Sequence, residues 1–163
     1  MDNDPIVLSH ARALLISSPH GACAYLDADL KDTAKILAEA AQTLDFSQPV
    51  AVLFVGVLHL VSGDEDPYGI VADMVNATVL GSYLALTHPA KDINADEVAE
   101  GARRYNEHVK VRPIRRTYEE TLRFFDGLQA VPPGLVQCHR WRPDPGPPTG
   151  RRTCRHGGGV ARK

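Results

Sequence analysis

The longest uninterrupted apolar segment of the chain, residues 50–58, limits the fold more than any other feature. It reads Val-Ala-Val-Leu-Phe-Val-Gly-Val-Leu and contains no polar side chain. A strand with one solvated face would alternate apolar and polar residues, whereas strands buried on both faces of a parallel sheet are apolar throughout. The segment therefore predicts a central parallel strand with packed layers on both sides.

Predicted helices and strands alternate around this segment. Asp4 and Pro5 suit the N-cap and first position of a helix that ends by Pro19, and Asp66 and Pro67 open another helix in the same way. We expect further helices over 32–44, 95–108 and 117–125, and strands over 22–26, 82–87, 128–131 and 135–141. This order predicts an α/β fold with a mostly parallel sheet, whose last two strands form an antiparallel C-terminal hairpin.

Length and composition fit one globular domain. The chain has 163 residues, 44% hydrophobic and 23% charged, and its acidic first residues do not resemble a secretory signal, so we expect a cytoplasmic protein without a membrane segment. Residues 1–143 are the expected domain and 144–163 a Pro/Gly/Arg-rich tail. Residues 140–163 hold seven basic side chains and one acidic one, although the net charge is −2. The acidic remainder argues against a broad nucleic-acid face.

The three cysteines predict neither disulfides nor a metal centre. Cys23, Cys138 and Cys154 are odd in number and far apart, and no CxxC pair occurs. His156 near Cys154 adds one ligand where structural zinc needs four. We therefore expect no metal.

Acidic residues lie where ligands bind in open α/β sheets, outside the carboxyl ends of strands. Asp27 and Asp29 follow the predicted strand 22–26, and Asp2 and Asp4 precede the first helix. Carboxylates in these places could accept ribose hydroxyls and an adenine amine. The alternative is that they cap helices or are solvated loop acids.

His59 follows the central strand directly. An imidazole there could accept a proton from a substrate at neutral pH, and a structural histidine bonded to a backbone carbonyl is the alternative. His88, at the end of the strand 82–87, has the same two interpretations.

Seven segments, in order along the chain, resemble a family of S-adenosylmethionine-dependent methyltransferases formerly catalogued as a domain of unknown function. The resemblance runs nearly end to end and includes the closing Gly-Gly-Val-Ala-Arg-Lys. Its segments are Asp-Asn-Asp-Pro at 2–5, Asp-Ala-Asp-Leu at 27–30, Val-Leu-His-Leu at 57–60, Asp-Pro-Tyr-Gly-Ile-Val at 66–71, Gly-Ser-Tyr-Leu at 81–84, Arg-Phe-Phe-Asp-Gly-Leu at 123–128 and His-Arg-Trp-Arg-Pro at 139–143.

The resemblance implies a Rossmann-like class I methyltransferase sheet of seven strands with the last antiparallel, and S-adenosylmethionine as cofactor. By position, Asp2 would bind the ribose hydroxyls with Asn3 beside it. Asp29, with Asp27 as the second choice, would meet the adenine amine. The remaining implied contacts are Ala28 and Leu30 along the adenine ring, Val57 and Leu58 at the methionine end, and His59 as the catalytic residue.

The chain departs from this family at its N-terminus. Such enzymes begin with a strand and a glycine-rich turn, and here the sequence opens at the ribose acid, so we expect an N-terminally truncated sheet with an exposed edge that favours self-association. The expected function is methyl transfer to an acceptor of unknown identity, a small molecule. A non-catalytic binding module that keeps the fold is the alternative, and a dehydrogenase fragment is a third interpretation.

Overall fold

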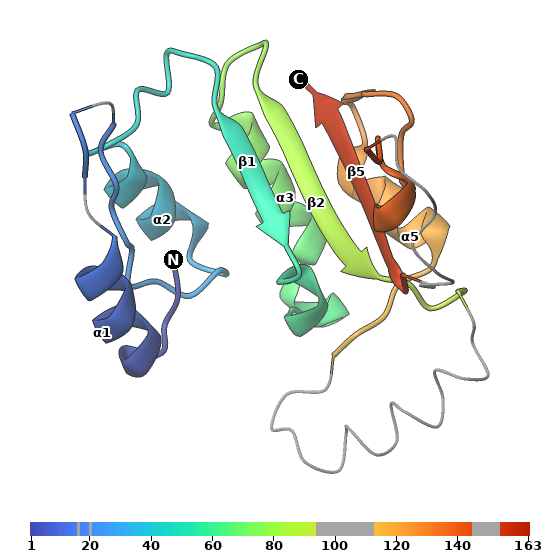
Figure 1. The fold of residues 1–163 in the computed structure, drawn as a ribbon, viewed down its shortest axis with the longest axis horizontal. Coiled ribbons are helices and arrows are strands. Elements are labelled where there is room, and N and C mark those ends of the chain that lie inside the picture. The colour runs from blue at the N-terminus through green and yellow to red at the C-terminus, as the bar shows by residue number, and fades with distance from the viewer. Residues whose placement is uncertain (16, 20, 94–112, 145–153) are drawn as a thin grey trace.

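The computed structural model describes residues 1–15, 17–19, 21–93, 113–144 and 154–163 (Figure 1). Its helices and strands are, in chain order, α1 (Pro5–Leu14), α2 (Thr33–Ala40), β1 (Ala51–Val55), α3 (Pro67–Asn76), β2 (Tyr83–Pro89), α5 (Tyr118–Leu122), β3 (Gln129–Ala130), β4 (Val136–Gln137) and β5 (His156–Arg162). Four single-turn 3₁₀ helices connect them, η1 (Leu58–Leu60), η2 (Gly63–Glu65), η3 (Arg123–Phe125) and η4 (Cys138–Arg140).

The strands form one mixed sheet, in the order β1-β2-β5-β3, with β4 also paired to β5. β1 and β2 run parallel, and β5 is antiparallel to β2, β3 and β4. The α/β class is confirmed. The expectation of a mostly parallel sheet is wrong for the described strands, because β5 makes every pairing other than β1–β2 antiparallel.

The predicted C-terminal hairpin is also wrong. β3 and β4 lie within the two segments expected to pair with each other, yet both pair with β5, which the sequence assigned to the tail. Glycines explain the difference: a Cβ at Gly158 would lie 2.9 Å from Cys138 Sγ, and one at Gly159 would lie 3.1 Å from Phe125. The glycines that gave this stretch a linker-like sequence allow it to pack closely between other elements.

Among the described strands, β1 lies at the edge of the sheet and has one covered face. α3 lies behind β1 and β2 (Figure 1). Phe54 is 4% exposed and belongs to the same hydrophobic core as Ile70 and Met74 of α3. Leu53 and Val55 point the other way and are 62% and 66% exposed. The prediction of a strand buried on both faces is wrong within the described residues, because none of their elements covers the outer face. The strand also ends at Val55, before the end of the apolar segment, and Leu58 begins η1.

Other predicted boundaries need smaller corrections. The expected strand 22–26 does not form, and its neighbourhood contributes an isolated parallel bridge between Asp2 and Asp27. α2 ends at Ala40, short of the expected 44, and turns follow it. The expected helix 95–108 falls outside the described residues.

Local helix signals are confirmed. Asp4 Oδ1 accepts a hydrogen bond from Ile6 N at 2.8 Å, and Asp66 Oδ1 accepts one from Gly69 N at 3.0 Å, each with proline following the cap. Thr117 and Glu120 form the expected capping box at α5. Among the described residues, no helix is both long enough and apolar enough to cross a bilayer.

A buried arginine joins the sheet to η1. Arg116 is 5% exposed, and its guanidinium donates to the carbonyls of Leu58 and Val61 at 2.9 and 3.1 Å. Its Nη1 also lies 2.8 Å from His88 Nε2, while His88 Nδ1 lies 3.0 Å from the Pro89 carbonyl. Since a carbonyl can only accept, His88 carries its proton on Nδ1 and receives the arginine bond on Nε2, as a neutral imidazole.

We expect stability to fall as the pH drops from about 7 to about 5. Burial, and secondarily the charge of Arg116, lowers the pKa of His88 from 6.5 to about 4. The unfolded chain therefore binds the additional proton over this range, and the free energy of unfolding declines by at most about 1.4 kcal/mol per pH unit. Urea unfolding at several pH values measures this slope. The variant His88→Gln lacks the titrating ring and should show a flatter slope; equal slopes would contradict the assignment.

Candidate functional site

A cavity of about 340 Å³ lies beyond the carboxyl end of β1, where the N-terminal segment approaches η1 and η2. It combines acidic, basic and apolar side chains from three parts of the chain. The lining residues are Met1, Asp2, Asn3, Ala28, Asp29, Leu30, Lys31, Val57, Leu60, Val61 and Glu65.

Backbone pairing places the two acidic segments side by side. Asp2 N donates to the Leu26 carbonyl and Ala28 N donates to the Asp2 carbonyl, both at 3.2 Å. Asp2 Oδ1 accepts from Asp4 N at 3.0 Å, which fixes the side chain at the start of α1. Within the described residues, Oδ2 of Asp2 has no hydrogen-bond partner and remains available to a ligand.

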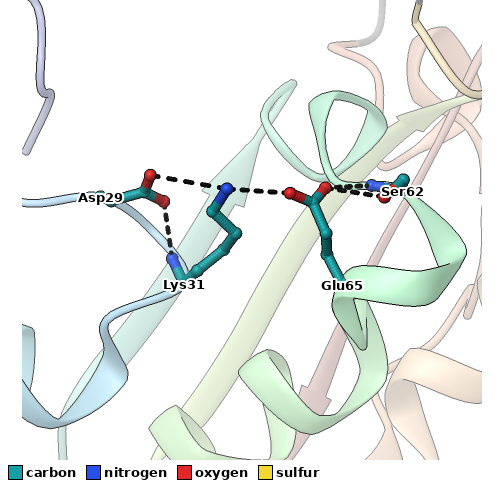
Figure 2. Close-up of polar contacts among 4 residues, drawn as sticks. All are labelled: Asp29, Lys31, Ser62 and Glu65. Carbon is teal, nitrogen blue, oxygen red and sulfur yellow. Dashed lines mark hydrogen bonds and ion pairs between the residues drawn. The ribbon is translucent and has the colours of Figure 1, made fainter.

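Asp29 belongs to a chain of charged contacts across the cavity (Figure 2). Its Oδ1 accepts from Lys31 N at 3.0 Å, and its Oδ2 lies 3.7 Å from Lys31 Nζ. Lys31 Nζ donates to Glu65 Oε1 at 2.8 Å. Glu65 Oε2 in turn accepts from Ser62 N at 2.9 Å and from Ser62 Oγ at 2.8 Å. The ammonium of Lys31 therefore bridges the N-terminal segment to η2.

This chain of contacts changes both pKa values in the directions expected for an ion pair. The hydrogen bond from Lys31, followed by the two from Ser62, lowers the pKa of Glu65 from 4.5 to about 2. The same bond to Glu65 is the main cause that raises the pKa of Lys31. Both side chains are substantially exposed, at 33% and 48%, so solvent screens the pair.

The structure brings six of the nine predicted site residues to this cavity. They are Asp2, Asn3, Ala28, Asp29, Leu30 and Val57. Two others lie elsewhere: Asp27 is not among the lining residues, and its carbonyl accepts from Lys35 Nζ at 2.6 Å, while Leu58 is fully buried in the core.

His59, the ninth, also does not line the cavity. Its ring is edge-on to His88 with centroids 6.4 Å apart, and its Nδ1 is buried without a hydrogen-bond partner among the described residues. Burial, with contributions from His156 and Arg116, lowers its pKa, so the ring is neutral near pH 7. Its backbone carbonyl accepts from Ile114 N at 2.7 Å.

Five lining residues were not predicted: Met1, Lys31, Leu60, Val61 and Glu65. Glu65 had a sequence signal, because it follows Ser62 at the spacing of a capping box, and that box forms around η2. Lys31 had none, since its partner lies 34 residues away. Within the described residues, no group of His, Cys, Asp and Glu side chains could hold a metal ion.

We expect the variant Lys31→Met to raise the pKa of Glu65. Losing the ammonium removes the largest cause of the lowered value, while the Ser62 bonds keep the pKa below 4.5. An NMR titration of the Glu65 carboxyl carbon measures the midpoint directly. Lys35→Met is the matched control, because Lys35 contacts Asp27 and Glu39 instead. In this variant the Glu65 midpoint should stay at about 2. A midpoint that moves equally in both variants would contradict the pairing.

Two solved structures share both sequence and fold with this chain. A DUF574 family protein from Streptomyces avermitilis MA-4680 is 40% identical with a TM-score of 0.92, and the alignment covers 99% of this chain and 63% of that one. A candidate methyltransferase from Thermobifida fusca YX is 35% identical with a TM-score of 0.84, covering 99% and 61%. This chain thus spans somewhat over three fifths of both.

A more distant structure agrees with the fold alone. N-methyltransferase NodS from Bradyrhizobium japonicum WM9, solved with S-adenosyl-L-homocysteine, is 12% identical with a TM-score of 0.56; the match covers 99% of this chain and 64% of that one. No curated protein matches the chain significantly. The family model described as S-adenosyl methyltransferase matches residues 1–163. The whole chain therefore belongs to the S-adenosyl methyltransferase family.

Proposed function

We propose that this chain binds the adenosine part of S-adenosylmethionine in the 340 Å³ cavity and takes part in methyl transfer to an acceptor. One observation carries the proposal. Asp2 and Asn3 come from one segment and Asp29 from another, and all three, to which the family resemblance pointed, line one cavity. Family membership supplies the reaction class.

The acceptor groups and apolar side chains of the cavity fit an adenosine ligand. Asp2 keeps Oδ2 free, and an ionised carboxylate is a strong acceptor for the vicinal hydroxyls of a ribose. Leu30, Val57 and Leu60 give the cavity apolar surface of the kind that adenine packs against. Asp29 would receive the exocyclic amine, because its carboxylate keeps acceptor capacity beside the bond from Lys31 N and the 3.7 Å contact with Lys31 Nζ.

The chain's own residues would bind and orient the cofactor. S-adenosylmethionine itself carries the activated methyl group on its sulfonium sulfur. No glycine is among the lining residues of this cavity. His59 has no place in this set of contacts. Asp2 and Asp29 would therefore recognise the adenosine part of the cofactor.

Replacing Asp2 should weaken binding of S-adenosylhomocysteine, the demethylated product. Asp2→Asn keeps the shape but removes the charge, and a lost charge-assisted hydrogen bond corresponds to a roughly tenfold to hundredfold weaker affinity. Isothermal titration calorimetry measures the dissociation constant. Asp27→Asn is the matched control, because Asp27 is absent from the lining, and its affinity should equal that of the wild type. Equal losses in the two variants, or no binding by the wild type, would refute the proposal.

A non-catalytic binding module is the second candidate. His59 was the residue predicted to accept a proton from the methyl acceptor, and it does not line the cavity. This placement favours a binding module without catalysis. Binding of S-adenosylhomocysteine together with a lack of methyl release from labelled S-adenosylmethionine over a panel of acceptors would support this candidate.

We also propose that the chain associates with itself through β1. Among the described strands, β1 pairs with β2 alone, and its outer face presents Leu53 and Val55. Exposed apolar edge strands are templates for pairing with another chain.

Leu53→Lys should therefore shift the chain toward the monomer. A charge at the centre of β1 disfavours burial of that face against a second copy. Sedimentation velocity over a concentration series measures the association. Leu80→Lys, at a position 80% exposed outside the strands, is the control and should sediment like the wild type. A monomeric wild type would contradict self-association.

A further inference from the structure

A second cavity of about 280 Å³ lies at the other side of the sheet's carboxyl edge, beyond the end of β2. It is enclosed by α5, the segment through β4 and η4, and the first residues of β5. The lining residues are His88, Ala90, Asp92, Ile93, Thr117, Tyr118, Thr121, Leu135, Val136, Gln137, Arg140 and Gly157.

Buried side chains form a defined inner wall. His88 is 1% exposed and Thr121 is 4% exposed. Both ring nitrogens of His88 are engaged, by the Pro89 carbonyl and by Arg116, so the ring offers the cavity an uncharged face. Thr121 Oγ1 donates to the Thr117 carbonyl at 2.8 Å and retains acceptor capacity. Together with the aliphatic side chains of the lining, this wall suits an apolar body.

Asp92 and Arg140, the charged residues at the rim, differ in their hydrogen-bond partners. Asp92 Oδ2 already accepts from Tyr118 N at 2.9 Å, which uses part of its acceptor capacity. Within the described residues, no ion pair or hydrogen bond engages the side chains of Arg140 or Gln137. Arg140 therefore supplies a cation with free donors, and its planar guanidinium matches a carboxylate in two-point geometry.

The second cavity is separate from the 340 Å³ cavity: the two share no lining residue, and the hydrogen bonds of Arg116 connect residues of both. Arg116 contacts His88 on one side and the carbonyls of Leu58 and Val61 on the other, and Val61 lines the first cavity. Since β1 and β2 are parallel, their carboxyl ends reach the same edge of the sheet, and the two cavities adjoin these ends. A molecule in the second cavity would thus neighbour the first without overlapping it.

We propose that this second cavity binds a small apolar carboxylate, with the carboxylate on Arg140 and Gln137 and the apolar body against Leu135, Val136 and the His88 ring. The cavity volume of about 280 Å³ accommodates a single-ring compound, smaller than a drug-sized ligand. Arg140 provides the charge complement, and the neutral inner wall excludes a buried charge. The site needs no methyl transfer to operate.

Three single-ring probes of similar size test the charge preference: benzoate, benzyl alcohol and benzylamine. Calorimetric or NMR titration of the wild-type chain should give benzoate the highest affinity, about tenfold above benzyl alcohol, with benzylamine weakest. Arg140→Gln should cost benzoate about tenfold and leave benzyl alcohol unchanged. Arg162→Gln is the control, because Arg162 is exposed at the opposite end of β5 and should leave all three affinities unchanged.

A filling variant tests the location. A Cβ at Gly157 would lie 3.5 Å from Leu135 Cδ1, an ordinary contact, and Gly157 pairs with His88 in register. The branches of Gly157→Val would enter the cavity and should abolish benzoate binding while circular dichroism stays unchanged. Should this variant misfold, the exposed Arg140→Gln substitution still decides the question.

Several results would overturn the inference. They are the absence of benzoate binding at about 10 mM, equal affinities for benzoate and benzyl alcohol, and equal losses in Arg140→Gln and Arg162→Gln. Competition between benzoate and S-adenosylhomocysteine would place benzoate in the first cavity and would also refute it. Benzoate binding by a chain that does not bind S-adenosylhomocysteine would support this site and refute the adenosine proposal, so the two can fail separately.

Discussion

The buried guanidinium of Arg116 holds together the parts of the molecule that form both cavities. It is 5% exposed, and its hydrogen bonds go to two carbonyls of the η1 region and to the neutral ring of His88 on β2. Its charge also lies over the rings of Phe124 and Tyr68, at 5.4 and 6.0 Å. A buried cation is tolerated when its donors are satisfied in this way, and losing one acceptor would leave part of it unpaired.

Arg116 also fixes one wall of the 340 Å³ cavity. Val57, Leu60 and Val61 line that cavity, and all belong to the turn that Arg116 fixes through the carbonyls of Leu58 and Val61. The opposite wall consists of residues 1–3 and 28–31, where Ala28 is buried in the hydrophobic core and Leu30 packs against that core. Polar contacts at its surface join it to the rest of the molecule, including Lys31 to Glu65 and Thr33 Oγ1 to Asp73 at 2.9 Å. One wall of the cavity is therefore fixed by a buried polar network, and the other by core packing together with exposed polar contacts.

The polar contacts of the two walls differ in their exposure to solvent. Exposed ion pairs are screened by solvent and contribute little to stability, whereas the bonds of Arg116 are made in the interior. The distance between Asp29 Oδ2 and Lys31 Nζ, 3.7 Å, is longer than the 2.8 Å between Lys31 Nζ and Glu65 Oε1. Asp29 is also the residue proposed to bind the adenine amine.

Features that depend on near neighbours could be predicted from the order of amino acids. Helix starts at Asp4 and Asp66 and the capping box at Thr117 were predictable, because a cap is a bond between residues two or three apart. The order of motifs identified the family and, through it, six of the cavity residues. The place of β5 followed from packing in three dimensions, because its glycines are informative only beside Phe125 and Cys138. The same holds for the Lys31–Glu65 pair and the exposure of β1, since charge pairing across 34 residues and the covering of a strand face depend on which segments meet in space.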